Sequence, residues 1–110
     1  MAIRTKALGV GSSGTANVTV TMYTCPVGHT AIVKSIWVSN GSGSAASLIL
    51  AANSGPVFVN LHVGSLAATS GVVQLEPYLV LEPGDSVVVN CSIANAAKYW
   101  VSGQELLGVA

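Results

Sequence analysis

The chain has 110 residues, which is enough for one domain with a two-layer core and too few for two. Charged residues make up 7% of it, against about 25% in an ordinary soluble domain, whereas 51% of its residues are hydrophobic. Four basic residues scattered along the chain cannot neutralise a run of phosphates, so nucleic-acid binding is not expected. A surface with so little charge is expected to be covered largely by other protein.

The sequence predicts neither a membrane span nor an export signal. No run approaches the roughly 20 uninterrupted apolar residues of a spanning helix. The N-terminal residues 1–9 have no apolar core of the kind that a secretory signal has. We therefore expect synthesis in the cytoplasm, where Cys25 and Cys91 would be reduced and buried, with a disulfide between them as the alternative.

The few charges are divided unevenly along the chain. A head-to-tail contact between copies could use this polarity, and a chance distribution of solvated charges is the alternative. Three basic residues precede position 75, and four acidic residues follow it with one lysine among them: Arg4, Lys6 and Lys34, then Glu76, Glu82, Asp85, Lys98 and Glu105.

Residues 1–14 are predicted to form an N-terminal arm or edge strand followed by a Gly/Ser loop, and residues 15–110 a single domain. Gly9 to Gly14 spells G-x-G-x-x-G, the spacing of a dinucleotide-binding loop. That motif requires a helix directly after it to hold the pyrophosphate. Residues 17–23 alternate β-branched and polar side chains instead, so we interpret the glycines as a flexible loop.

Further short strands are expected along the rest of the chain, separated by Gly-, Pro-, Asn- and Ser-rich turns. Pro77 should break one of them, because proline cannot donate to a strand ladder. One helical turn is plausible between Gly64 and Gly71. The expected strands span residues 30–40, 45–52, 57–63, 72–81 and 98–107.

Residues 79–92 carry the clearest reversal of the chain. Two apolar, β-branched runs flank Pro83-Gly84, and proline followed by glycine suits the two central positions of a tight turn. This pattern predicts a hairpin with Val87, Val89 and Cys91 facing the core. Glu82 and Asp85 would then lie on its solvated rim.

About eight short strands without an amphipathic helix predict an all-β protein, an antiparallel β-sandwich of jelly-roll type. This architecture leaves the order of the strands open, because alternation along a strand does not say which strand lies beside it.

Catalytic chemistry finds little support in the sequence. The Cys25-x-x-x-His29 spacing could supply two zinc ligands, but no compact second pair follows. Neither a nucleophile with its base nor a pair of facing carboxylates is marked by a motif. We therefore expect no enzymatic activity, no metal and no cofactor.

The aromatic residues allow two interpretations. Trp37 and Trp100 are expected to be core or interface residues, because a buried tryptophan removes a large apolar surface from water. The alternative is a sugar-binding platform in which tyrosines such as Tyr23, Tyr78 and Tyr99 take part.

The segments Tyr23–Asn40 and Leu81–Asp85, together with the Ser102-Gly103 pair near the chain end, resemble small bacteriophage virion proteins. Those proteins share a Pro-x-Gly turn, a long apolar strand that ends in Asn, and a Pro-Gly-Asp reversal. The resemblance covers about two thirds of the chain and rests on structural turns. It implies a β-sandwich that decorates or cements a capsid, or one that belongs to the tail or its fibres, without catalytic residues.

The composition and the resemblance together predict a non-enzymatic structural component of a phage particle, located in the virion. The preferred role is a capsid decoration or cement protein that contacts other copies of itself and the major capsid or other virion proteins. A trimer is favoured by analogy with other jelly rolls. The alternative is a tail or fibre module that binds host glycan. Interface residues are predicted to be Ile3, Arg4, Lys6, Trp37, Val88, Asn90 and Trp100.

Overall fold

Residues 3–69 and 71–107 are the part of the chain that the computed structural model describes, with residues 3–5 described by their backbone alone. This part forms nine β-strands and contains no helix that could cross a membrane. The strands are β1 (Ile3–Ser12), β2 (Val20–Thr24), β3 (His29–Asn40), β4 (Ala46–Ser54), β5 (Val57–Leu66), β6 (Val72–Leu75), β7 (Leu79–Leu81), β8 (Ser86–Cys91) and β9 (Ala97–Leu107).

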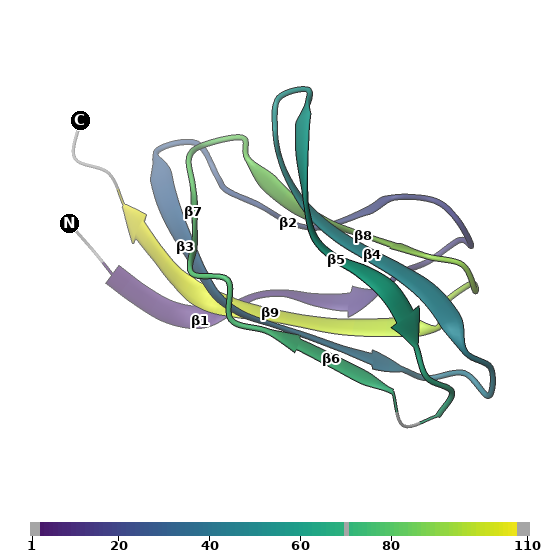
Figure 1. Cartoon of the computed structure of the whole chain (residues 1–110). Helices are drawn as coiled ribbons and strands as arrows, with labels where there is room; N and C mark the ends of the chain where they lie inside the picture. Colours follow the sequence, from purple (N-terminus) through teal and green to yellow (C-terminus); the bar gives the residue numbers. More distant parts are fainter. Residues whose placement is uncertain (1–2, 70, 108–110) are drawn as a thin grey trace.

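The strands form two antiparallel sheets that lie face to face (Figure 1). One sheet has the order β1-β9-β3-β6, with β7 also paired to β3, and the other has the order β2-β8-β4-β5. The chain passes between the sheets at most of its connections, which is the arrangement of a jelly roll. Strands β6 and β7 flank Pro77 and pair with the same neighbour, so they are the one broken strand that the sequence predicts. The predicted jelly-roll β-sandwich is confirmed.

The core lies between the two sheets and consists of aliphatic side chains from both. Each fully buried Leu, Ile or Val contributes about 1.5–3 kcal/mol relative to an exposed one. The largest fully buried aliphatic side chains are Val33, Ile36, Val38 and Val101 from one sheet and Leu48, Leu50, Leu66, Val87 and Val89 from the other.

Irregularities in the ladders change which side chains face the core. The pairing register shifts between Thr21 and Tyr23 in β2 and between Val33 and Ser35 in β3. Simple alternation places Tyr23 on the polar face of its strand. The shift turns Tyr23 inward instead, where it is 8% exposed. Such bulges are invisible to a period-two pattern because one extra residue inverts every later position.

The Pro83-Gly84 turn forms as predicted, but the prediction of a hairpin around it is wrong, because the two flanking strands do not pair with each other. The Asp85 N–H donates to the Glu82 carbonyl at 3.0 Å, and Gly84 has a φ of 90°. However, β7 pairs with β3 in one sheet, whereas β8 pairs with β2 and β4 in the other. The turn therefore carries the chain across the core from one sheet to the other.

The loop predicted over residues 9–14 is also largely strand, since β1 extends to Ser12 and pairs with β9 along its length. Its two glycines, Gly9 and Gly11, lie where little room is left for a side chain. A Cβ atom at Gly9 would overlap the carbonyl oxygen of Met22, and one at Gly11 would lie 2.8 Å from the hydroxyl oxygen of Tyr99. The first two glycines of the G-x-G-x-x-G spacing thus lie in a crowded strand, and Gly14 follows that strand with a φ of 65°.

Candidate functional site

Two tryptophans lie side by side on the outer face of the β1-β9-β3-β6 sheet. Trp37 on β3 is opposite Trp100 on β9, and Val10 on β1 is opposite Trp100 on its other side. Their exposed fractions are 44%, 53% and 56% for Trp37, Trp100 and Val10. With Ser39 and Lys98 they line an open hollow of about 340 Å³. We call Val10, Trp37, Trp100 and Lys98 the tryptophan face.

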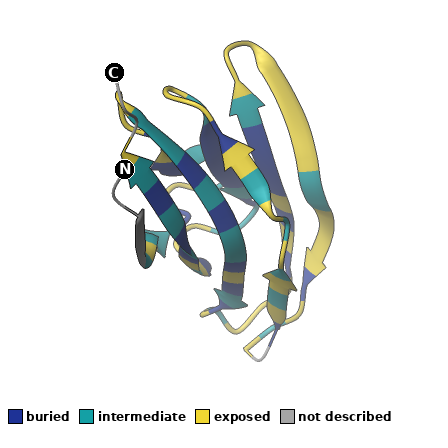
Figure 2. Cartoon of the chain, turned by 90° about the vertical axis from the view of Figure 1, so that its left-hand side faces the viewer, coloured by how far each residue is buried: buried dark blue, intermediate teal, exposed yellow. Residues whose placement is uncertain are grey.

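A second exposed apolar surface lies on β5, at the edge of the other sheet. Within the described residues β5 pairs with β4 alone, so its outer edge is open. Figure 2 shows the exposed colour along most of this strand. The large exposed side chains are Val57, Phe58, Val59 and Val63, each between 58% and 63% exposed. Because β5 forms a hairpin with β4, we call these four residues the hairpin surface.

The hairpin surface has apolar groups on both sides of the sheet. Val57 and Val59 line a cleft of about 200 Å³ that also includes Leu79 and Asp85. Phe58 lines a separate groove of about 200 Å³, together with residues of β4 and β8. A strand that is exposed and apolar on both faces resembles half of an interface more than an ordinary solvated edge.

The structure places the predicted interface residues on two separate surfaces. Trp37 and Trp100 belong to the tryptophan face, whereas Val88 and Asn90 line the groove beside Phe58 on the other sheet. Val88 is 7% exposed, because its neighbours within the chain already cover it. The Asn90 Nδ2 group donates to Thr19 Oγ1 at 3.3 Å.

The N-terminal predictions concern β1. Ile3 and Arg4 are paired with β9 through their backbones, but their side chains lie outside the described residues. Lys6 has a partner within its own chain, since its Nζ lies 2.8 Å from Glu105 Oε1. The charge of this lysine is therefore already paired within the subunit.

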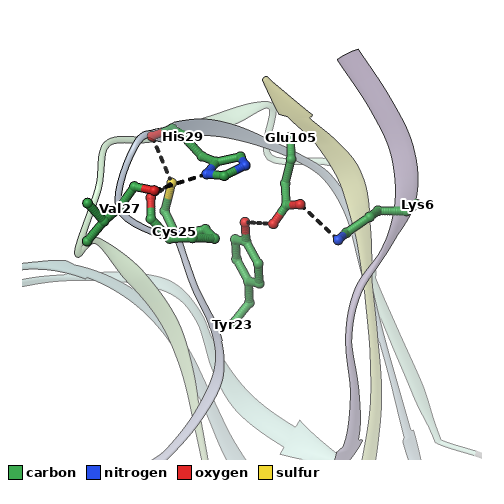
Figure 3. Close-up of polar contacts among 7 residues, drawn as sticks. Lys6, Tyr23, Cys25, Val27, His29 and Glu105 are labelled. Carbon is green, nitrogen blue, oxygen red and sulfur yellow. Dashed lines mark hydrogen bonds and ion pairs between the residues drawn. The ribbon is translucent and has the colours of Figure 1, made fainter. Parts of the chain in front are cut away.

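Glu105 is the centre of a polar network between the two sheets (Figure 3). It is 7% exposed and accepts a hydrogen bond of 2.6 Å from the Tyr23 hydroxyl, in addition to the ion pair with Lys6. The hydrogen bonds from Lys6 and then Tyr23 hold the pKa of Glu105 below its usual range. Burial, followed by the hydrogen bond to Glu105, raises the pKa of Tyr23 well above its usual range.

These shifts predict a stability maximum between two pH limits. The folded pKa of Glu105 is depressed, so its contribution exists above the unfolded value of about 4.3 and is lost as the pH falls. The folded pKa of Tyr23 is raised, so its contribution is lost as the pH rises above the unfolded value of about 10. In urea titrations across pH, Glu105→Gln should flatten the acid limb and Tyr23→Phe the alkaline limb, whereas the exposed Glu76→Gln should change neither.

The cysteines and histidines do not converge on a metal site. Cys25 and Cys91 are buried free thiols, and burial raises the pKa of the Cys25 thiol. The Cys25 thiol donates to the His29 carbonyl at 3.4 Å, while His29 Nδ1 lies 3.1 Å from the Val27 carbonyl (Figure 3). His62 has a buried Nε2 without a hydrogen-bond partner among the described residues. In the same part of the chain no three potential ligands lie close enough to hold a metal.

Sequence reasoning missed the hairpin surface. The sequence predicts a strand over residues 57–63, but alternation along a strand does not say that both of its faces are exposed. One signal could have identified an exposed edge that needs a partner: no charged residue occurs between Lys34 and Glu76. Ordinary edge strands carry charge or proline to prevent pairing with other chains.

Comparisons with known proteins support the fold class. No protein-family model and no curated protein matches the sequence. Among solved structures, the chain is similar to the core of Drosophila NLP, whose crystal structure is described as giving insight into pentamer formation and histone binding. The identity is 15%, the coverage is 96% of this chain and 99% of that one, and the TM-score is 0.50.

A second solved structure, from infectious bursal disease virus strain Gt, is less similar. It is 10% identical, with coverage of 94% of this chain and 32% of that one and a TM-score of 0.30. Likenesses at this level of identity bear on fold alone, and fold does not determine function. The candidate function therefore has to come from the surfaces of this chain.

Proposed function

We propose that this chain is a non-enzymatic structural subunit that assembles with copies of itself. One observation carries the proposal: the hairpin surface and the tryptophan face together expose large apolar side chains on both sheets of a chain with 7% charged residues. Large apolar side chains that are exposed next to one another are typical of interaction sites. Burial of a tryptophan at an interface is a frequent source of binding energy.

We further propose that the subunit belongs to a bacteriophage particle and acts as a capsid decoration or cement protein. The resemblance of residues 23–40 and 81–85 to small virion proteins supports this role, and the jelly-roll fold is compatible with it. The protein would be synthesised in the host cytoplasm and located in the virion. A trimer is our preferred state, and the pentamer described for the NLP core is the alternative. Histone binding is not proposed, because four acidic residues offer little attraction to a basic partner.

Self-assembly can be tested through the tryptophans themselves. The chain has two tryptophans, and both lie on the tryptophan face, so burial of that face should shift their fluorescence emission to shorter wavelength. We expect the shift to follow protein concentration, in parallel with the mass measured by light scattering. A single subunit mass at every concentration, with unchanged emission, would contradict self-assembly by the isolated chain.

A test of the virion role requires particles made with and without the protein. We expect particles that lack it to lose their contents at a lower temperature or at low salt, and to recover when the purified protein is added. Unchanged capsid integrity together with lost adsorption to the host would overturn the cement role.

That second outcome would favour glycan binding, the alternative supported by the exposed Trp37–Trp100 pair beside Ser39 and Lys98. Sandwich domains can hold sugars against aromatic faces, and adjacent exposed indoles provide such a face. In this case a glycan from the host surface should change the tryptophan emission at constant protein concentration. Trp37→Ala should abolish the response.

A further inference from the structure

We propose that subunits join head to tail, with the hairpin surface of one copy seated on the tryptophan face of the next. This inference rests on the proposed self-assembly and specifies its contact. The two surfaces come from different sheets and from different parts of the chain: β5 supplies one, and β1, β3 and β9 supply the other. They are therefore available at the same time for two different neighbours.

The shape of the hairpin surface favours insertion into a hollow. The turn that joins β4 to β5 stands at the top of Figure 1, beyond the neighbouring turns at that end of the sandwich. Val57 and Val59 face one side of β5 and Phe58 lines a groove on the other, so a partner has to contact both sides. The open hollow of about 340 Å³ that Trp37 and Trp100 help to line offers a recess for such an insertion.

The charges around the two surfaces are complementary. Asp85 lines the same cleft as Val57, and Glu82 is exposed in the same turn, so the hairpin surface has acidic neighbours. Lys98 is exposed beside Trp100 and lines the hollow of the tryptophan face. Opposite charges at the rim of an apolar contact fix its orientation and suppress incorrect pairings.

Symmetric contacts satisfy these observations less well. Two tryptophan faces packed against each other would give Lys98 no acidic partner, because none of the residues that line the hollow is acidic. Two β5 edges paired with each other would leave Trp37 and Trp100 in water. A contact between two different surfaces repeats from copy to copy and closes into a ring when its rotation permits.

The test mixes two variants that each retain one surface. Phe58→Glu removes the centre of the hairpin surface, and Trp100→Glu removes the centre of the tryptophan face. Both positions are more than half exposed, so the variants should fold, as circular dichroism can confirm. Each variant alone should associate about 30-fold more weakly than the unmodified chain, as expected for loss of a central interface residue.

When the variants are mixed, the intact hairpin surface of Trp100→Glu can seat on the intact tryptophan face of Phe58→Glu. We expect a 1:1 heterodimer in native mass spectrometry that grows no further. The matched control is Val27→Glu on the 91% exposed Val27, which should assemble like the unmodified chain. Monomers in the mixture, with an oligomeric unmodified chain, would overturn the head-to-tail contact and leave the proposed function intact. A monomeric unmodified chain would overturn self-assembly as well.

Discussion

Gly103→Ala is expected to lower the free energy of unfolding by at least about 3 kcal/mol, the upper end of the usual cost of overpacking. Gly103 is buried in β9, between Lys6 of β1 and Val33 of β3. A Cβ atom there would overlap the carbonyl oxygen of Ile32 and lie 3.1 Å from the backbone nitrogen of Lys34. These are backbone atoms that cannot rotate away, so the substitution has to separate the central strands of the sheet.

The loss should be a large fraction of the about 5–15 kcal/mol that stabilises a whole domain. Urea denaturation followed by circular dichroism measures it. Gly43→Ala is the matched control, because a Cβ atom at Gly43 meets nothing within 4 Å. It should be neutral, or stabilising by a few tenths of a kcal/mol through the unfolded state. Equal urea midpoints for both variants would show that β9 and β3 are not packed so closely at Gly103.

The contrast between these glycines illustrates what the sequence could predict about the fold. Alternation and turn residues located the strands, including the break at Pro77 and the reversal at Pro83-Gly84, because these depend on neighbouring residues. The close approach at Gly103 depends on Ile32, which is far away in sequence. The pairing of the arms on either side of Pro83-Gly84 likewise depends on the whole sandwich, so a local pattern predicted a hairpin where the chain crosses between sheets.

The candidate site, like the fold, was predictable in its individual residues but not in the contacts between distant segments. Trp37 and Trp100 were predicted as interface residues, and their side-by-side position follows only from the register of β3 with β9. Lys6 was predicted at an interface, but it pairs with Glu105 inside the subunit. Tyr23 reaches the same carboxylate because a bulge turns it inward. Period-two reasoning cannot anticipate either contact, since each joins residues from opposite ends of the chain.

Asn40 is the position where a second large loss of stability is expected, because one buried side chain ties several segments together. Its Nδ2 group donates to the carbonyl oxygens of Ser44, Leu66 and Ala67 at 2.9, 3.2 and 3.0 Å. Its Oδ1 atom accepts from the backbone nitrogen and the hydroxyl of Ser42 at 2.8 and 2.9 Å. These contacts fasten the base of the β4–β5 hairpin to the end of β3.

Asn40→Leu keeps the size of the side chain and removes all of these hydrogen bonds. A buried polar group left without a partner costs about 1–3 kcal/mol. The Leu66 residue is buried, whereas Ser44 and Ala67 are exposed and their carbonyl groups can turn to water, so we expect a total loss of about 2–4 kcal/mol. Asn40→Asp should be at least as costly at neutral pH, because it directs a carboxylate at three carbonyl oxygens. The exposed Asn60→Asp is the control and should change the free energy of unfolding little. An unchanged urea midpoint for Asn40→Leu would contradict this role.

The same substitution connects the fold to the proposed assembly. Leu66 ends β5 and Ser44 precedes β4, so loss of the Asn40 contacts should loosen the strands that present the hairpin surface. Amide hydrogen exchange in β4 and β5 should then accelerate before that of β3 and β9. If the hairpin surface seats on the tryptophan face, the concentration-dependent emission shift of Asn40→Leu should weaken under conditions in which the variant is still folded. An emission shift of normal strength in a variant with a loosened hairpin would show that assembly uses a different surface.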